Sequence, residues 1–394
     1  MTTDALARPH SHGAVPPEIV PPKTKSQLLR SFNVDDFPTL NGREEDWRFT
    51  PLRRLRGLHD SSAAPAAAAP RHEYGELPEG VSITTVGKDD KRIGSILTPF
   101  DRPSAQAFTS MDRALLLAVA RNAVVDSPVV VKVNGQGSQG ASFGHTFIDV
   151  GESAAVTVVL DQVGSATLAD NIEISVGANS QLTLVSVADW DSDTVQLQHQ
   201  KARIGRDATL KHVAVTLGGD LVRQYLSAEF AGPGGSIDAH GLYFADRGQH
   251  FEHRQLIDHG VPDCRSNVNY RGALQGADAH TVWVGDVLIQ DVATGTDTYE
   301  INRNLVLTDG ARADSVPNLE IETGEIVSAG HASATGRFDD EQLFYLQSRG
   351  IAADEARRLV VRGFFADLVN KIPVEELRER LHDTIEARLD EVAP

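Results

Sequence analysis

The sequence has a single cysteine among its 394 residues, and this scarcity excludes several classes of site. Cys264 alone cannot form an intrachain disulfide, a zinc finger or a four-cysteine cluster site. Metal chemistry in this chain would therefore need other side chains or ligands from a partner protein. So few cysteines are typical of a protein of the reducing cytoplasm, and we predict that location.

Long hydrophobic runs and a surplus of positive charge are missing as well. No window of about 18 consecutive apolar residues occurs, so the sequence predicts no membrane-spanning helix. The N-terminus lacks the charged head and apolar core of a secretory signal. With 37 basic and 55 acidic residues the net charge is −18, which repels phosphate backbones and anionic lipids. We therefore predict neither nucleic acid nor membrane as a partner.

Catalytic motifs are also missing. The sequence has no glycine-rich loop ending in Lys and Ser or Thr, which would bind ATP phosphates, and no Gly-x-Ser-x-Gly turn of the hydrolase type. Residues 232–235, Gly-Pro-Gly-Gly, have the glycine content of a phosphate loop but lack the following lysine. We therefore predict that the chain is not an enzyme.

What the sequence does contain is a long tract of short β-branched segments, from residue 127 to about 318. A Gly-x-x-(Ala/Ser) motif before a strand pattern recurs there, starting at Gly151, Gly177, Gly205, Gly276 and Gly310, with a stretched version at Gly232. The first three starts and the step to Gly232 are 26, 28 and 27 residues apart. This period is typical of a β-solenoid, here of about nine coils. An antiparallel β-sandwich is the alternative, but Asn134-Gly135 alone resembles a hairpin turn.

The regions around this tract differ from it in composition. A helix is expected at about 109–123, where Leu115, Leu116 and Val119 lie within a turn of one another. The predicted organisation is a disordered tail at 1–24, a helical and irregular region at 25–126 with a low-complexity linker at 61–70, a β-helix core at 127–337 and a helical domain at 338–394.

The C-terminal pattern is helical. Asp339 with Gln342 predicts a capped helix start, and Gly350 predicts that helix's end. A second helix at 353–371 and a third after Pro373 each carry one apolar stripe, which we interpret chiefly as core packing. Three short helices bury little core by themselves, so a partner covering part of this domain is also expected.

Residues 309–351 carry a resemblance to a known family. The matching positions are Pro317, Leu319, Glu320, Ile321, Val327, His331, Ala332, Thr335, Gly336, Phe344, Tyr345, Leu346, Ser348, Arg349, Gly350 and Ile351. This run resembles the signature of the SufB/SufD family, the paired scaffold subunits of the Suf iron–sulfur cluster assembly machinery. The family cysteine two residues before the histidine is Ala329 here, which favours the SufD side, and one extra residue precedes Thr335. Residues 45–52, with Trp47, are similar to a second family element near the N-terminus.

The resemblance implies a right-handed parallel β-helix and two partners. His331 would be an interfacial ligand of a transient iron–sulfur cluster shared with SufB, beside a SufB-facing region at Pro317, Leu319, Glu320 and Ile321. The C-terminal domain would dock the ABC-type ATPase SufC through Phe344, Tyr345, Leu346, Arg349, Gly363 and Phe364. No cofactor is expected to stay bound to the chain alone, and the sequence does not decide whether reduced flavin binds the complex or whether the isolated chain forms a homodimer.

Other candidate residues receive structural interpretations. Cys264 and His259 match a family stretch and are secondary candidates, but Cys264 is expected to be a buried small residue rather than a reactive thiol. In the run from His250 to His253, a strand would point His250 and Glu252 to one face and His253 to the other, so a three-ligand site would need a turn. For His331, a neutral imidazole is a competent iron ligand near neutral pH.

Two alternative functions remain open at this point. The first is a purely structural interaction protein, a homodimer or SufB mimic without cluster contact, and Ala329 in place of the cysteine favours it. The second is a β-solenoid enzyme acting on acidic polysaccharides. The negative charge and the missing secretory signal argue against that enzyme.

Overall fold

The computed structural model describes residues 28–66, 68–337 and 340–390. The fold is mainly β, with 47% of residues in strands, and forms a β-solenoid of about 8 turns followed by a helical region. The predicted fold class is therefore confirmed, with about eight turns where about nine coils were expected. The predicted disordered tail at 1–24 lies outside the described residues. None of the described helices is long and apolar enough to cross a membrane.

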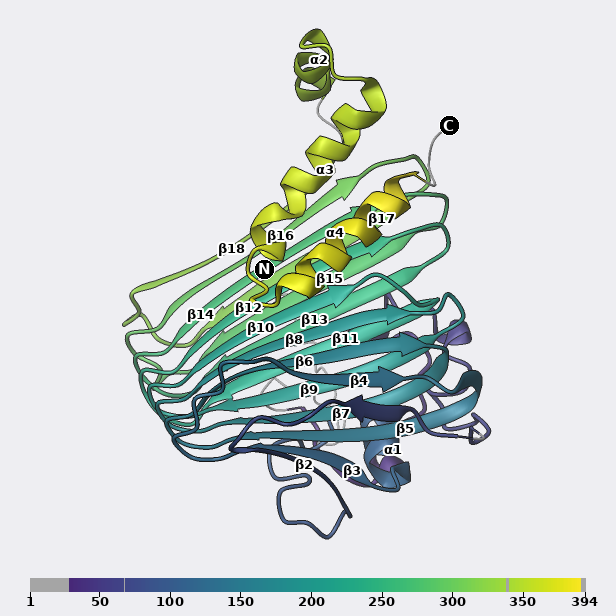
Figure 1. Cartoon of the computed structure of the whole chain (residues 1–394). Helices are drawn as coiled ribbons and strands as arrows, with labels where there is room; N and C mark the ends of the chain where they lie inside the picture. The colour runs from purple at the N-terminus through teal and green to yellow at the C-terminus, as the bar shows by residue number, and fades with distance from the viewer. Residues whose placement is uncertain (1–27, 67, 338–339, 391–394) are drawn as a thin grey trace, which may run out of the picture.

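Two nine-stranded sheets form the walls of the solenoid, and from the third strand onward consecutive strands alternate between them (Figure 1). The first sheet has the order β1 (Arg71–Tyr74), β4 (Val129–Asn134), β6 (Ala155–Gly164), β8 (Gln181–Trp190), β10 (Thr209–Thr216), β12 (Ser236–Ala245), β14 (Arg265–Leu274), β16 (Asp297–Val306) and β18 (Ser328–Arg337). The second sheet has the order β2 (Val81–Val86), β3 (Ala114–Val119), β5 (Gly137–Val150), β7 (Ala166–Val176), β9 (Val195–Ile204), β11 (Leu221–Phe230), β13 (His250–His259), β15 (His280–Ile289) and β17 (Arg312–Ile321).

Strand pairing differs at the N-terminal end from the rest of the stack. β1 pairs with β4 and β2 pairs with β3 in antiparallel fashion, whereas the pairs that follow are parallel, with one register shift in β5 between Gly137 and Ser142. Because side chains alternate along a strand, every second residue faces the interior. Inward side chains such as Ile174, Leu184 and Leu210 are fully buried in one continuous core. Towards the C-terminal end this interior also takes in polar side chains, including His253 and Asn302.

The recurrent glycines mark turns where successive coils lie very close together. A Cβ on Gly177 would lie 2.7 Å from the backbone nitrogen of Glu152 in the preceding coil, so a larger residue does not fit. The left-handed backbone conformation falls instead on Asn179, two residues later, with φ of 57°, and likewise on Ser153 and Asp207. At these three turns glycine allows close stacking and a short polar residue adopts the left-handed conformation, whereas Gly276 and Gly310 have positive φ themselves, +82° and +83°.

The helix expected at 109–123 is wrong. Helix α1 (Arg102–Ser110) ends before most of that stretch, and Ala114–Val119 is strand β3. Leu115 and Leu117 face the solenoid core, while Leu116 packs in a separate cluster on the other side of the sheet. A run that is apolar on both faces has no period-2 alternation, so it could not be distinguished from a buried helix.

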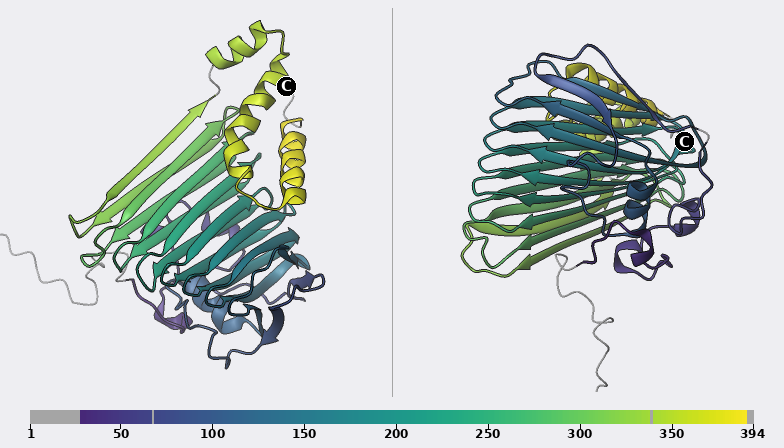
Figure 2. Two further views of the ribbon diagram at one scale, coloured as in Figure 1. Left: turned by 60° about the vertical axis from the view of Figure 1, so that its left-hand side comes forward. Right: turned by 90° about the horizontal axis from the view of Figure 1, so that it is seen from below.

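Different parts of the chain cover the outer faces of the two sheets (Figure 2). The N-terminal segment, with short 3₁₀ turns η3 (Val34–Asp36), η4 (Glu45–Trp47) and η5 (Leu52–Arg54), covers the second sheet together with α1. The segment at 61–70 also joins this layer, because Ala64 and Ala66 exchange backbone hydrogen bonds with Ala141.

Helices α3 (Ala353–Val369) and α4 (Glu375–Asp390) pack on the first sheet, where Val361, Phe365 and Leu381 join a cluster with outward-facing strand residues. Their apolar stripes are thus core, as predicted. Helix α2 (Asp340–Ser348) stands away from both sheets (Figure 1). It ends as expected at Gly350, whose φ is +86°, with Ile351 N donating to Leu346 O. The predicted N-cap at Asp339 lies outside the described residues.

Candidate functional site

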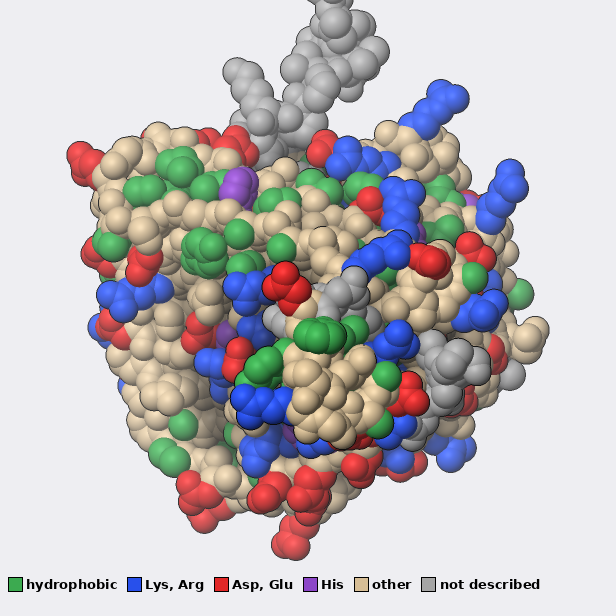
Figure 3. Space-filling model, turned by 90° about the horizontal axis from the view of Figure 1, so that it is seen from above, with side chains coloured by type: hydrophobic (Ala, Val, Ile, Leu, Met, Phe, Trp, Pro, Cys, Tyr) green, Lys and Arg blue, Asp and Glu red, His purple; other side chains and the backbone are tan. Residues whose placement is uncertain are grey.

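The C-terminal end of the solenoid presents two long edge strands, β17 and β18, which we call the open end. Side chains of β15 are almost all buried, whereas those of β17 and β18 are exposed or half-buried along their whole length. The exposed apolar residues here include Ile321, at 46%, and Val327, at 71%. Figure 3, seen from the side of this end, shows hydrophobic side chains lying among charged ones and among uncharged surface. A further strand or another protein could cover this surface.

His331 lies on β18 with its side chain towards the interior of the open end. It pairs in register with Glu300 on β16, and its Nδ1 atom is 3.8 Å from Oε1 of Glu300. The imidazole is 42% exposed, so it remains accessible from outside. Ala329 shares this inward face and pairs with Thr298. The position of the family cysteine is therefore at the open end, but it holds a methyl group.

Glu300 is a buried carboxyl that the sequence analysis did not single out. Its side chain is 1% exposed, and neither oxygen makes a hydrogen bond of standard geometry. Burial, and then the charge of Asp286, raise the pKa of Glu300 to about 8, and the backbone N–H of Asn318 offsets this only in part. Across the interior lies Gly285, where an added Cβ would overlap Oε2 of Glu300.

The four residues predicted to face SufB lie on β17. Pro317, Leu319 and Ile321 alternate with Glu320 along the strand. Burial, together with the charges of Glu322 and Asp286, raises the pKa of Glu320. A cavity of about 270 Å³ runs along this strand and reaches His331. The structure thus brings His331 and the β17 residues together at one end.

The secondary candidates Cys264 and His259 are buried structural residues. Cys264 is fully buried, its Sγ lies 3.6 Å from Gly232 O, and burial raises its thiol pKa. His259 Nε2 is 2.8 Å from the Ser266 hydroxyl, and burial lowers the pKa of this imidazole to about 4. These features match the interpretation of Cys264 as a small core residue.

From the run His250 to His253, His250 and Glu252 belong to a buried polar network under the N-terminal segment, whereas His253 faces the solenoid interior and stacks on Tyr243. Glu252 accepts a hydrogen bond of 2.6 Å from Thr50 Oγ1 and ion-pairs with Arg223 and Arg254. Burial would raise the pKa of Glu252, but the Arg223 charge and the other partners outweigh it and hold that pKa well below its usual range. Trp47 stacks on Arg223, so the N-terminal element is an aromatic plug. Among the described residues, no group of three His, Cys, Asp or Glu is arranged to hold a metal.

The residues predicted to dock SufC fall into two groups. On α2, Phe344 is 71% exposed and Tyr345 is 56% exposed, and Arg349 lies 5.0 Å from the Tyr345 ring. On α3, Phe364 is partly buried against the helix–sheet cluster, and its carbonyl accepts from Arg271. Of the remaining two residues, Leu346 on α2 is half-buried. Gly363 on α3 is exposed and has open space beside it. The α2 group is the exposed one.

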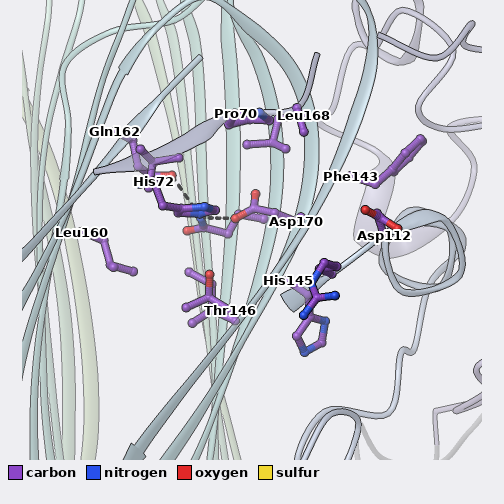
Figure 4. A pocket seen from close by; sticks show the side chains of 16 residues that line it. Pro70, His72, Asp112, Phe143, His145, Thr146, Leu160, Gln162, Leu168 and Asp170 are labelled. Atoms are coloured by element: carbon purple, nitrogen blue, oxygen red, sulfur yellow. Dashed lines mark hydrogen bonds between the residues drawn. The ribbon is translucent and has the colours of Figure 1, made fainter. Parts of the chain in front are cut away.

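A second cavity, which the sequence did not indicate, lies at the N-terminal end and has a volume of about 200 Å³. Figure 4 shows Asp170 pointing into it from β7, with Gln162 and His72 on the facing side. Asp170 accepts hydrogen bonds from Gln198 Nε2 at 2.8 Å and Gln196 Nε2 at 3.2 Å. Burial raises the pKa of Asp170 to about 7. These residues come from four strands of both sheets, and the register of β7 with β9 brings Asp170 beside Gln198.

Comparison with known proteins gives a consistent family. The family model described as the SUF system FeS cluster assembly SufBD core domain matches residues 132–364. An iron–sulfur cluster assembly SufBD family protein of Mycobacterium bovis is 57% identical over 372 residues, covering 93% of each chain.

More distant relatives carry the SufD name. The iron–sulfur cluster assembly protein SufD of Bacillus subtilis is 29% identical over 282 residues, covering 69% of this chain and 63% of its own. The SufD protein of Escherichia coli is 26% identical over 398 residues, covering 92% and 91%. The core family model matches more than half of the chain, and the Mycobacterium bovis relative is 57% identical along 93% of it. This chain therefore belongs to the SufBD family of iron–sulfur cluster assembly proteins.

Proposed function

We propose that this chain is a SufD-like scaffold subunit, which pairs with a cysteine-bearing SufB paralogue and docks the SufC ATPase during iron–sulfur cluster assembly in the cytoplasm. The observation that carries the proposal is the open end: two full-length edge strands, unlike the strands before them, leave their side chains exposed around His331. A second solenoid with a similar end would cover this surface. The distant SufD relatives support this side of the family.

Helix α2 supports the second contact. It contacts α3 but stands apart from the sheets, and it exposes Phe344 and Tyr345, two large apolar residues within one turn. Exposed aromatic residues of this kind are common anchors in protein interfaces. SufC bound at α2 would be joined through α3 to the first sheet, because α3 packs there through Val361 and Phe365. Movement of the ATPase would in this way reach the solenoid.

In this proposal the chain performs no catalytic step of its own. The cluster is cargo that is held briefly between the two scaffold subunits, with His331 as this chain's ligand and a SufB cysteine opposite. ATP hydrolysis belongs to SufC. Reduced flavin would bind the assembled complex, if it participates, rather than this chain alone.

One alternative has a specific observation in its favour. Ala329 removes the family thiol from the open end, as would suit a structural partner or homodimer without cluster contact. A His331→Ala variant separates the two functions. Normal assembly together with a normal cluster yield in that variant would favour the structural role.

The proposal is tested by anaerobic affinity purification of the tagged chain from its host, with and without residues 338–394, read by mass spectrometry. We expect an ABC-type ATPase to co-purify with the full-length chain alone, and a cysteine-bearing SufBD paralogue to co-purify with both forms. The absence of both proteins from the full-length sample would contradict the proposed function.

A further inference from the structure

Glu300 has an unusual position for a buried acid. Of the described residues, no Lys or Arg forms an ion pair with it, and neither of its oxygens has a hydrogen bond of standard geometry. Buried polar groups in folded proteins are almost always paired, and an exception commonly marks an ion or water that binds there. The inward position of Glu300 on β16 therefore needs an explanation beyond packing.

The distance from Glu300 to His331 fits a shared metal ion. At 3.8 Å, Nδ1 of His331 and Oε1 of Glu300 are too far apart for a normal hydrogen bond. Two ligand atoms that each bind one metal at about 2.0–2.2 Å lie at most about 4.4 Å apart. The present geometry therefore allows one ion to bind both atoms without movement of the strands.

Neighbouring residues keep space free for the carboxylate. The strand facing Glu300 across the interior has Gly285 at the contact point, and any side chain there would overlap Oε2. On the other side, the imidazole of His331 is 42% exposed, so an ion could reach the pair from the open end. Gly285 thus leaves space on the buried side of the carboxyl, and the imidazole beside it is accessible from the open end.

We propose that Glu300 and His331 form a two-ligand half-site for a divalent transition metal, with ferrous iron as the ion used in assembly. In the family signature a thiol stands two residues before the histidine; here a carboxylate from the neighbouring strand supplies the second ligand in its place. The site is incomplete until water or a partner's side chain fills the remaining positions. The identification of the ion as cluster iron rests on the proposed function, whereas the half-site itself does not.

The test is anaerobic titration of the purified full-length chain with Co²⁺, followed by its visible absorption and by isothermal calorimetry. Wild type is expected to bind one ion per chain. Glu300→Gln and His331→Ala should each weaken binding about tenfold or more, because each removes one of two protein ligands. Glu325→Gln is the control, since Glu325 is an exposed acid between β17 and β18 that does not line the cavity at His331, and it should leave binding unchanged.

A further variant distinguishes loss of metal binding from misfolding. Gly285→Ala leaves both ligands in the chain but places a methyl group against the carboxylate and against the buried Trp283 ring, so it should also weaken Co²⁺ binding, and thermal unfolding checks that this variant is folded. Wild-type affinity in folded Glu300→Gln would overturn the half-site. If Co²⁺ binds as expected but no paralogue co-purifies, the proposed function fails and the half-site stands. If the paralogue co-purifies and Glu300→Gln binds Co²⁺ normally, the proposed function stands and the half-site fails.

Discussion

Each end of the solenoid has an inward-facing carboxyl group, half-buried at one end and fully buried at the other, and the surroundings of the two groups differ. At the N-terminal end, Asp170 accepts hydrogen bonds from two glutamine amides inside a small cavity. At the C-terminal end, Glu300 has no such donors and faces an accessible imidazole. The first group is satisfied within the chain, and the second is arranged to be satisfied from outside.

The strands at the two ends also differ, in length and in direction of pairing. The N-terminal end finishes in two short antiparallel strands, β1 with 4 residues and β2 with 6. The C-terminal end finishes in two parallel strands of 10 residues each. Short edge strands offer little to a passing chain, while long flat ones invite pairing. The comparison shows that one end of the fold finishes in short strands, whereas the other leaves two long edge strands exposed.

The largest expected effect concerns Asp170, the carboxyl group that accepts hydrogen bonds within the chain. Because burial raises the pKa of Asp170 from 3.8 to about 7, the folded chain holds a proton there that the unfolded chain releases, so this group costs stability as pH rises from about 4 to 7. Asp170→Asn should remove that loss. Relative to wild type, its free energy of unfolding should rise by about 3 kcal/mol between pH 4.5 and pH 8, measured with urea. If the difference in free energy of unfolding between Asp170→Asn and wild type is the same at both pH values, this prediction is wrong.

The next largest effect concerns the exposed surface of the open end. Val327→Arg places a charge on an exposed apolar residue of the open end, and we expect it to weaken binding of the cysteine-bearing paralogue about a hundredfold, or about 3 kcal/mol. Val124→Arg is the control, because Val124 is equally exposed at 72% but lies before β4 near the N-terminal end. Calorimetry of the purified pair gives both affinities. Equal losses in the two variants would remove the distinction between the ends.

A smaller gain is expected from restoring the family thiol. Ala329→Cys adds an inward-facing sulfur on the same strand face as His331, and thiolate is a strong ligand for Co²⁺. Affinity should rise about tenfold, accompanied by sulfur-to-cobalt charge-transfer absorption in the near ultraviolet. Tighter binding without that absorption would mean that the sulfur does not reach the ion.

The smallest effect is expected for the buried cysteine. Cys264→Ala removes one small buried side chain from the core, so the free energy of unfolding should fall by about 1 kcal/mol. Co²⁺ affinity and partner binding should not change. A loss of either would give Cys264 a role at the open end that its burial does not suggest.

The repeating architecture could be predicted because its cause is local. Each coil needs a residue without a side chain where coils touch and a short residue that turns the chain, and the sequence repeats both at a regular interval. The position of His331 at the open end also followed, because a contiguous signature places it after the last glycine motif.

Other features depend on residues that meet only in space. Nothing near Glu300 in the sequence indicates that it stands opposite His331, since that pairing arises from the register of β16 with β18. The same holds for Asp170 and Gln198. β3 was mistaken for a helix because its leucines are buried on both faces, which removes the alternation that identifies a strand.

Strict parallel register also constrains how such a chain can change over time. In the middle of the stack, an insertion of one residue within a strand would turn every following side chain to the opposite face and disturb both neighbouring coils. The extra residue that separates this chain from the family signature precedes Thr335, on β18, the last strand described. No later coil has to follow that strand. The open end is therefore the part of the solenoid where length variation, and with it new partner specificity, can arise at the least cost to the rest of the fold.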